Sequence, residues 1–466
     1  MVDARLPIDA ADSILDLVGH TPLVRLPRVC EAEGIRCTLV AKLETTNPGG
    51  SVKDRVAIAM IDAAERDGLL APGGTIVEPT SGNTGSGLAI VAAQRGYRCI
   101  FVMSDKMSDE KVALLRAYGA EVVVCPTAVP PEDPRSYYST AERLVRETPG
   151  AFRPDQYSNA ANPRAHERTT GPEVWEQTRG RVTHFVAGIG TGGTITGVGR
   201  FLKAQNSSVQ IVGADPSGSV YSGGTGRPYL TEGIGEDFWP TTFDRSIVDR
   251  VIEVSVADAF LTARRITCEE GLLIGGSGGT AVHAALAVAR ESGPNDVVVV
   301  LVPDSGRSYL SKIYDDGWMF DMGFLRAEGP VAGDVLAAKG TALPSLVLIT
   351  PDRPVRDAIA LMHDTGVSQL VVAVTTELPL AVKEVTGTLR ELELMDLAFR
   401  DHEVLDRSIA DVMGDPMPMI GVGEPVARVV ECLDAGTSAI VVDGGHPIGV
   451  LTRSDVLGFL AARSPA

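Results

Sequence analysis

Short apolar runs alternate with helix-like segments from about residue 38 to residue 302, and this alternation restricts the chain to few folds. The runs have the length of buried strands and lie at 39–43, 75–78, 99–103, 121–124, 183–187, 209–214 and 297–302. Helix-like segments lie between most of them, at 52–66, 84–95, 108–117, 137–147, 192–204 and 279–290. Apolar strands joined by crossover helices are typical of a largely parallel sheet. The pattern therefore predicts an α/β fold, with one further short strand near 21–26.

Ligands of such sheets bind beyond the carboxyl ends of the strands, in the loops that lead into helices. The first loop of interest, 47–55, contains a Pro-Gly-Gly-Ser turn. With Ser51 as the expected N-cap, Lys53 falls in the first helical turn, where the helix dipole disfavours a cation. Lys53 is then either an ordinary surface residue or an amine that is kept easy to deprotonate. Schiff-base chemistry with an aldehyde cofactor requires the second kind of amine.

The second loop, 78–85, combines hydroxyl and amide side chains at an expected helix N-terminus. Thr80, Ser81 and Thr84 supply hydroxyl groups, and Asn83 supplies an amide that could bind a phenolic oxygen. One interpretation is a strand end followed by an ordinary capped helix. The other is a cup that holds a carboxylate at the positive end of the helix.

Two later loops are rich in glycine. In 188–194, consecutive glycines at a helix start let backbone N–H groups converge on a phosphate. This loop lacks the Gly-Lys-Ser/Thr ending and the dinucleotide spacing, which favours a single phosphate held by amides and by the hydroxyls of Thr191 and Thr194. In 274–280, Ser277 either caps the next helix or hydrogen-bonds a heterocyclic nitrogen, and the sequence leaves both open.

Together, these loops indicate pyridoxal phosphate, and they resemble those of the fold-type II pyridoxal-phosphate enzymes, which have a tryptophan synthase β-like fold. The resemblance covers about residues 10–325 and includes 232–238. It implies Lys53 as the Schiff-base lysine. It also implies Asn83 at the 3′ oxygen of the cofactor, Ser277 at the pyridine nitrogen, and Gly190, Thr191, Gly192, Gly193 and Thr194 at the phosphate. The implied substrate pocket consists of Thr80, Ser81, Thr84, Gln156, Tyr157 and Gly233.

Within that group, residues 303–323 resemble the end of the catalytic core of the cystathionine β-synthases. The chain after about residue 340 holds a degenerate repeat of helix, strand, strand and helix, which resembles a pair of CBS domains (a Bateman module). Such pairs bind adenosyl ligands, and S-adenosylmethionine is the one expected here. In the second copy Thr452 and Asp455 match residues that hold a ribose, whereas the first copy has no matching aspartate near 385–389.

The resemblance implies a domain order with boundaries at 1–325 for the catalytic core, 326–340 for a linker, and 341–400 and 401–466 for the two CBS domains. The implied reaction is a β-replacement that condenses L-serine with L-homocysteine to cystathionine and water, a step of transsulfuration and cysteine biosynthesis. Sulfhydrylation of O-acetylserine and sulfide-producing β-replacement of cysteine would use the same loops. A nucleotide-sensing regulatory protein with an inert core is the alternative from another class. Glu236 replaces a tyrosine often found in the Glu-Gly-Ile-Gly-Tyr-Asp version of its loop, which affects the expected binding of the second substrate.

Composition excludes several partners. The net charge of −18 argues against nucleic acid and anionic membranes. The six cysteines form no CxxC pair, so neither a metal site nor a disulfide framework is predicted. No secretion signal or membrane-length apolar run is apparent, and a cytoplasmic protein is expected. About 20 residues precede Thr21, without a Cys and His pair, so no haem is predicted. The resemblance also implies a homo-oligomer, either a dimer or a tetramer.

Overall fold

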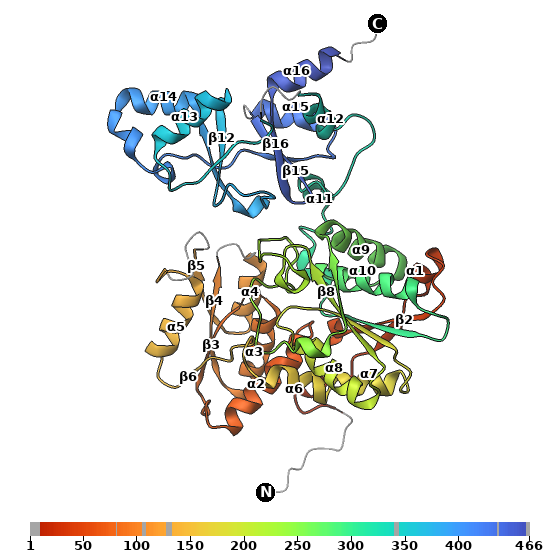
Figure 1. Cartoon of the computed structure of the whole chain (residues 1–466). Coiled ribbons are helices and arrows are strands. Elements are labelled where there is room, and N and C mark those ends of the chain that lie inside the picture. Colours follow the sequence, from red (N-terminus) through yellow and green to blue (C-terminus); the bar gives the residue numbers. More distant parts are fainter. Residues whose placement is uncertain are drawn as a thin grey trace. The chain divides into compact units, whose positions relative to one another are not determined.

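The computed structural model describes residues 10–80, 82–104, 109–126, 133–339, 344–435 and 438–462. Its contacts divide the chain into two compact units, one comprising residues up to 226 with 231–309, and the other 227–230 with the chain from 310 onward. Both are traced in Figure 1. The division at 309/310 differs from the expected boundary at 325. Residues after 310 join the second unit because Ala327 N donates to Gly423 O and Gly445 N donates to Met322 O, both at 2.8 Å.

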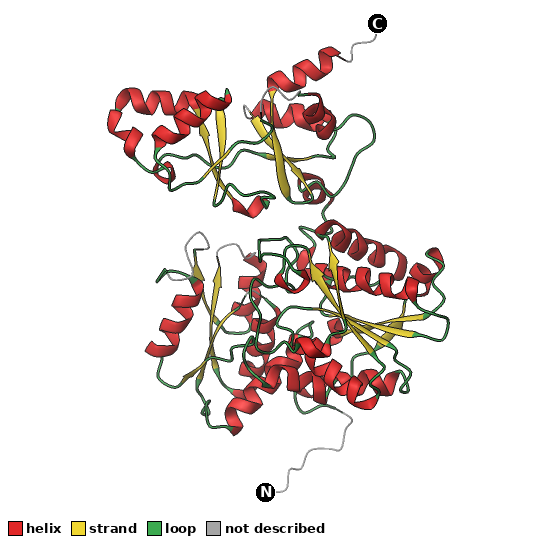
Figure 2. Ribbon diagram, viewed as in Figure 1, coloured by secondary structure: helices red, strands yellow, loops and turns green. Residues whose placement is uncertain are grey.

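A six-stranded sheet forms one half of the first unit. Its order is β1 (Leu23–Arg25), β2 (Thr38–Leu43), β10 (Val297–Val302), β7 (His184–Gly188), β8 (Gln210–Pro216) and β9 (Arg250–Val254). All neighbouring strands are parallel except β1, which runs antiparallel to β2. Helices lie on both sides of this sheet (Figure 2). They are α1 (Pro27–Ala32), α7 (Thr170–Gln177), α8 (Gly193–Gln205), α9 (Val256–Glu270) and α10 (Gly276–Glu291).

A four-stranded parallel sheet forms the other half of the first unit. Its order is β5 (Glu121–Cys125), β4 (Arg98–Ser104), β3 (Thr75–Pro79) and β6 (Ala151–Phe152). The helices of this half are α2 (Lys53–Arg66), α3 (Asn83–Arg95), α4 (Asp109–Ala117) and α5 (Tyr137–Glu147), and α6 (Ala161–Arg168) contacts both α2 and α8. Met60, Ile61, Leu88 and Phe101 are fully buried in the core between sheet and helices.

These elements confirm the predicted α/β fold. Each predicted strand and helix of the first unit is present within a few residues of its expected bounds. Strands β6 and β9 and helices α1, α6, α7 and α9 were not predicted. β6 has two residues, and β9 is an edge strand whose sequence begins with Arg250 and includes Glu253, so neither forms a continuous apolar run.

The second unit contains two three-stranded sheets. One has the order β11 (Leu348–Ile349), β12 (Gln369–Ala373) and β13 (Val385–Arg390), and the other β14 (Met419–Gly421), β15 (Ser438–Asp443) and β16 (His446–Thr452). Its helices are α11 (Asp316–Asp321), α12 (Ala332–Ala338), α13 (Val355–Thr365), α14 (Glu391–Arg400), α15 (Val426–Ala435) and α16 (Arg453–Ala462). The order helix, strand, strand, helix occurs twice, as the repeat predicts.

The two repeats bury apolar faces of their sheets against each other. Val371 and Val385 of the first repeat share one buried cluster with Ile440 and Val442 of the second. This packing confirms that one repeat alone would leave an apolar surface exposed. The expected linker, 326–340, contains α12, which packs into the core of the second repeat because Ala332 and Val335 are fully buried there.

Candidate active site

The loop before α2 brings Lys53 to the carboxyl end of β10. Val52 N donates to Pro303 O at 2.9 Å, directly after that strand. α2 begins at Lys53 itself, with Val52 as the N-cap residue, so the prediction of Ser51 as N-cap was wrong by one position. The Ser51 hydroxyl accepts a hydrogen bond from Lys53 N at 3.2 Å. Lys53 is therefore the first helical residue, at the positive end of the α2 dipole.

Buried ion pairs anchor the same helix. Arg55 Nε donates to Glu44 Oε2 at 2.7 Å, and its Nη1 donates to Glu173 Oε1 at 2.6 Å. The fully buried Lys42 also pairs with Glu173 at 2.6 Å. Removing one member would leave an uncompensated buried charge, so the network is costly to disrupt. These ion pairs therefore fix the start of α2, and with it the position of Lys53.

Lys53 lines a partly open pocket beside the phosphate loop. The pocket is lined by Val52, Lys53, Gly188, Gly190, Thr191, Gly192, Thr194, Gly233, Ile234, Leu301 and Pro303. Burial lowers the pKa of the Lys53 amine, and the carboxylates of Asp304 and Glu236 oppose that shift. The pocket therefore combines an amine that loses its proton more easily than an exposed lysine with the predicted phosphate loop.

Close packing explains the glycines of that loop. Gly192 has φ +77°, and a Cβ added there would lie 2.3 Å from the Cβ of Phe243. A Cβ added at Gly193, the first residue of α8, would lie 2.0 Å from Asn162 Oδ1. Only glycine fits both positions. The first N–H groups of α8 have no partner within the helix, and they lie at the pocket.

Side chains from distant segments fix the loop threonines and Gly190. Asn162 Nδ2 donates to Thr191 Oγ1 at 3.0 Å, and Tyr221 OH donates to Gly190 O at 2.6 Å. Thr194 Oγ1 lies 3.2 Å from His166 Nε2. Burial holds the pKa of His166 well below its usual value, so the imidazole is neutral. Sequence reasoning missed Asn162, His166 and Tyr221, because no local motif marks them.

Asn83 does not cap its helix. α3 begins at Asn83 with Gly82 as the N-cap residue, and Asn83 Nδ2 donates to Asp304 Oδ2 at 2.9 Å. Tyr309 OH donates to the same oxygen at 2.9 Å. The other oxygen, Asp304 Oδ1, has no hydrogen-bond partner among the described residues. Burial raises the pKa of Asp304, and Lys53 is among the groups that oppose the rise.

Asp304 is a site residue that sequence reasoning missed. It lies two residues after the end of the apolar strand β10, at the same edge of the sheet as the glycine loops. Loops beyond the carboxyl ends of the strands were expected to bind ligands, and Asp304 lies in such a loop. The same criterion could therefore have identified Asp304 from the sequence.

The predicted carboxylate cup is assembled only in part within the described residues. Thr84 Oγ1 donates to Gln156 Oε1 at 2.7 Å, so these two predicted substrate residues do meet. Thr80 Oγ1 accepts from Gly85 N at 3.2 Å, at the start of α3. Ser81 lies outside the described residues.

Ser277 is the second residue of α10 and is buried. The N-cap residue is Gly275, without a side-chain hydrogen bond, so Ser277 is not the cap. Its hydroxyl is therefore not needed to cap α10.

The loop that holds Gly233 and Glu236 packs on the phosphate loop. Gly235 N donates to Ile189 O at 2.7 Å. Tyr157, another predicted substrate residue, lies close enough to the side chain of Glu236 to stabilise its charged form. Burial raises the pKa of Glu236 to about 7, Asp237 adds to the rise, and Tyr157 and Lys53 oppose it. Gly233 has φ +83°, a conformation that glycine adopts without strain.

These residues fit pyridoxal phosphate. A compact phosphate ester needs the glycine loop and the N-terminus of α8, and an aldehyde needs an amine such as Lys53 in the same pocket. Because residues 188–199 contain neither lysine nor arginine, a phosphate here would be held by main-chain N–H groups and threonine hydroxyls.

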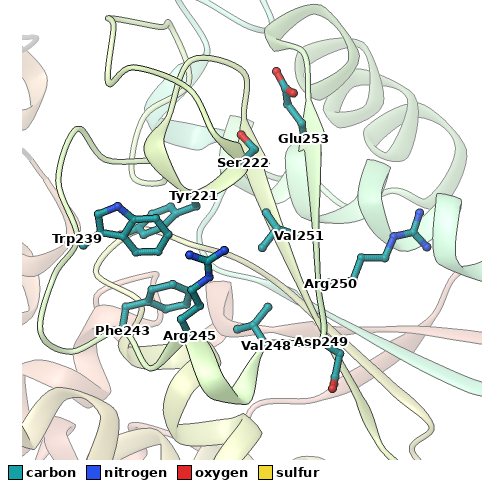
Figure 3. A pocket seen from close by; sticks show the side chains of 10 residues that line it. All are labelled: Tyr221, Ser222, Trp239, Phe243, Arg245, Val248, Asp249, Arg250, Val251 and Glu253. Atoms are coloured by element: carbon teal, nitrogen blue, oxygen red, sulfur yellow. The ribbon is translucent and has the colours of Figure 1, made fainter.

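A second, open pocket adjoins the phosphate loop through Tyr221 (Figure 3). The ring centroids of Trp239 and Phe243 lie 5.8 Å apart, and those of Tyr221 and Phe243 lie 5.0 Å apart. The Arg245 guanidinium lies 5.4 Å from the Trp239 ring. Figure 3 shows these side chains together, beside the valines and charged residues of β9 and the turn before it. This aromatic cluster packs against the glycine loop, because Phe243 lies beside Gly192 and Tyr221 donates to Gly190 O.

In the second unit, Thr452 and Asp455 lie in a pocket between the two repeats. Asp455 Oδ2 accepts from Thr452 N and from Thr452 Oγ1, both at 2.7 Å. Lys339 Nζ lies 3.4 Å from the same oxygen and donates to Val450 O at 2.7 Å. Sequence reasoning missed Lys339, which lay in the expected linker. In the first repeat the corresponding third residue of α14 is Glu393, which pairs with Arg390 at 2.9 Å.

The described residues contain no group of three or more His, Cys, Asp and Glu side chains that could hold a metal ion. Among the described helices, none has both the length and the apolar character needed to cross a bilayer.

Comparisons with known proteins agree with this geometry. Residues 14–304 match the family of pyridoxal-phosphate dependent enzymes, and residues 409–462 match the CBS domain. Crystal structures of O-ureido-L-serine synthase (39% identity, TM-score 0.62) and of a hydrogen sulfide-producing enzyme from Fusobacterium nucleatum (35%, 0.61) are similar. They cover 66% and 65% of this chain, and 99% and 98% of the respective structures.

Curated relatives extend the likeness to nearly the whole chain. Cystathionine beta-synthase of Oryctolagus cuniculus is 39% identical over 97% of this chain and 85% of the relative. That of Saccharomyces cerevisiae is 35% identical over 99% of this chain and 100% of the relative. The match to the enzyme of Mus musculus, 44% identical over 76% of this chain, spans 65% of that relative, just under two thirds. The chain therefore belongs to the cystathionine beta-synthases, pyridoxal-phosphate-dependent enzymes with a C-terminal CBS domain.

Proposed function

We propose that this chain condenses L-serine with L-homocysteine to cystathionine and water, with Lys53 as the catalytic residue. The observation that carries the proposal is the shared pocket of Lys53 and the glycine loop 188–194. Relatives that match the chain along nearly its whole length and are named cystathionine beta-synthase support this choice of substrates. In the reaction the C–O bond at the β-carbon of serine breaks, a C–S bond forms, and the thiol proton ends on water.

The cofactor is held at three places in this proposal. Main-chain N–H groups of Gly190, Gly192 and Gly193, with the Thr191 and Thr194 hydroxyls, bind the phosphate. Asn83, oriented by Asp304, donates to the 3′ oxygen, and Ser277 binds the pyridine nitrogen. Pyridoxal phosphate supplies the electron sink that acidifies the α-carbon of a bound amino acid.

Lys53 moves the protons. Its lowered pKa suits an amine that removes the α-proton and then delivers a proton to the departing hydroxyl. Thr84 and Gln156, already hydrogen-bonded to each other, bind the substrate carboxylate together with Thr80 and Ser81. Tyr157 and Gly233 border the same space.

The second unit is proposed to bind an adenosyl ligand, S-adenosylmethionine being the expected one. Asp455 and Thr452 would form hydrogen bonds with the ribose hydroxyls. Because Lys339 contacts Asp455, its ammonium must move aside or contact the ligand itself. We further propose a haem-free, cytoplasmic homo-oligomer, either a dimer or a tetramer.

The test is product analysis by mass spectrometry with serine and homocysteine, O-acetylserine and sulfide, or cysteine alone. We expect cystathionine to be the main product. Lys53→Ala should abolish both product and the visible absorbance of the bound cofactor. Lys203→Ala, which removes a lysine paired with Asp249 outside the pocket, should leave both unchanged.

Dominant use of O-acetylserine and sulfide would instead favour the sulfhydrylase alternative. A colourless protein that takes up no added pyridoxal phosphate would contradict the enzyme proposal and favour a regulatory protein. Normal turnover by Lys53→Ala would show that Lys53 is not the catalytic residue.

A further inference from the structure

Glu236 has no role in the proposed reaction so far, yet its backbone is fixed beside the active-site pocket. Glu236 N donates to Ser219 Oγ at 3.1 Å, and Val220 N donates to Glu236 O at 3.0 Å. The preceding residue, Gly235, donates to Ile189 O of the phosphate loop at 2.7 Å. The position of the Glu236 side chain is therefore tied to the loop that lines the pocket.

The carboxylate of Glu236 is directed by two residues of the site. Tyr157 and Lys53 both lie close enough to this carboxylate to stabilise its charged form. The ring of Tyr157 packs edge-on against Phe238, with centroids 5.3 Å apart, which limits the motion of the tyrosine. Glu236 thus places a negative charge at the border of the substrate space.

A partly buried negative charge discriminates between nucleophiles. Homocysteine carries an α-ammonium group that a carboxylate attracts, whereas hydrosulfide is an anion that a carboxylate repels. Where a tyrosine stands at this position, as in the Glu-Gly-Ile-Gly-Tyr-Asp version of the loop, that charge is missing. The presence of a glutamate or a tyrosine at this position therefore affects whether homocysteine or hydrosulfide reacts as the second substrate.

We propose that Glu236 is a specificity-determining residue whose carboxylate binds the α-ammonium of the incoming amino-acid thiol and disfavours hydrosulfide. This inference rests on the proposed β-replacement and adds which residue selects its second substrate. Tyr157 acts as a positioning residue, because it stabilises the carboxylate and its own ring is packed against Phe238.

The charge of Glu236 sets a pH dependence. The pKa of about 7 results from burial and from Asp237, opposed by Tyr157 and Lys53. The carboxylate is ionised at pH 8.5 and becomes neutral as pH falls through 7. The preference for homocysteine over hydrosulfide should therefore weaken below pH 7.

Glu236→Gln tests the proposal at pH 8.5 with saturating serine. We expect kcat/KM for homocysteine to fall at least tenfold, mainly through KM, and the ratio of hydrosulfide to homocysteine kcat/KM to rise at least tenfold. Glu236→Asp keeps the charge and should shift the ratio less than threefold. Asp237→Asn removes the same charge from the exposed neighbouring residue and should shift it less than twofold.

Exchange of the serine α-hydrogen is measured by NMR in D₂O without thiol. It distinguishes a failure of the proposed reaction from a failure of the role proposed for Glu236. In Glu236→Gln this exchange should fall much less than kcat/KM for homocysteine. An unchanged nucleophile ratio in that variant, with exchange intact, would overturn the role of Glu236 alone. Equal shifts in Glu236→Gln and Asp237→Asn would also overturn it. No exchange in the wild-type protein would overturn the proposed function and this inference with it.

Discussion

Asn83 and Asp304, 221 residues apart in the chain, are joined by a hydrogen bond of 2.9 Å from the amide to the carboxylate. Asp304 Oδ2 also accepts from Tyr309, so one buried oxygen orients two side chains. Because Asp304 follows β10 and Asn83 opens α3, the bond links the six-stranded and four-stranded halves of the first unit at the candidate site.

Asp304→Ala should therefore weaken cofactor binding through Asn83. Removing the acceptor leaves the buried Tyr309 hydroxyl and the partly buried Asn83 amide unpaired, at a cost of about 1–3 kcal/mol for a fully buried donor. We expect the dissociation constant for pyridoxal phosphate, from an absorbance titration, to rise at least tenfold. Tyr309→Phe removes only one hydrogen bond to the same oxygen and should raise it less than threefold. Additive losses in Asn83→Ala and Asp304→Ala combined would show that the two act independently.

Gly192→Ala should prevent the phosphate loop from forming. The added Cβ would meet Phe243 at 2.3 Å on a residue with φ +77°. We expect loss of bound cofactor and a melting temperature lower by several degrees, measured by absorbance and thermal scan. Gly223→Ala is the matched control, because φ is +98° there but the space around a Cβ is open. If both variants kept the cofactor, close packing of Gly192 would not matter for binding.

Glu78 should make stability depend on pH. It accepts from Asp155 N at 3.1 Å, and burial raises its pKa from 4.5 to about 7. A raised carboxyl pKa favours the folded state below pH 4.5, and this contribution is lost as pH rises through 7. The loss amounts to about 3 kcal/mol at 1.36 kcal/mol per pKa unit.

Glu78→Gln removes this titration. The melting temperature of the variant relative to wild type should rise between pH 4.5 and pH 8. Glu147→Gln, at an exposed carboxylate paired with Arg143, should show no such trend. A constant difference between Glu78→Gln and wild type across this range would contradict the raised pKa.

Lys339 and Asp455 make the regulatory proposal testable. S-adenosylmethionine should raise the melting temperature of the wild-type protein in proportion to the logarithm of its concentration. Asp455→Asn should abolish that rise, because the ribose loses its acceptor. Lys339→Ala removes the ammonium that contacts Asp455 and should change the half-maximal ligand concentration at least threefold. A wild-type protein that shows neither a thermal shift nor a change in rate with the ligand would refute the proposal.

Local chemistry explains what could be predicted. The roles of the glycines of 188–194 and of the lysine at the start of α2 could be predicted from the sequence. Backbone N–H groups and dipoles at helix starts depend on only a few neighbouring residues. The repeat in the second unit is readable because each copy carries its own apolar strands. Two of the local predictions failed or stayed open. Ser51 lies one residue before the N-cap, and the choice between two uses of Ser277 needed the start of α10.

The amino-acid sequence by itself therefore determined the alternation of strands and helices, the phosphate loop and the position of Lys53. The tertiary structure decided which distant side chains share one hydrogen bond or one charge environment: Asp304 with Asn83, Tyr157 with Glu236, and Lys339 with Asp455. The physical reason is that secondary structure follows from neighbouring residues, whereas burial and hydrogen-bond partners depend on segments that meet only when the sheets and their helices pack.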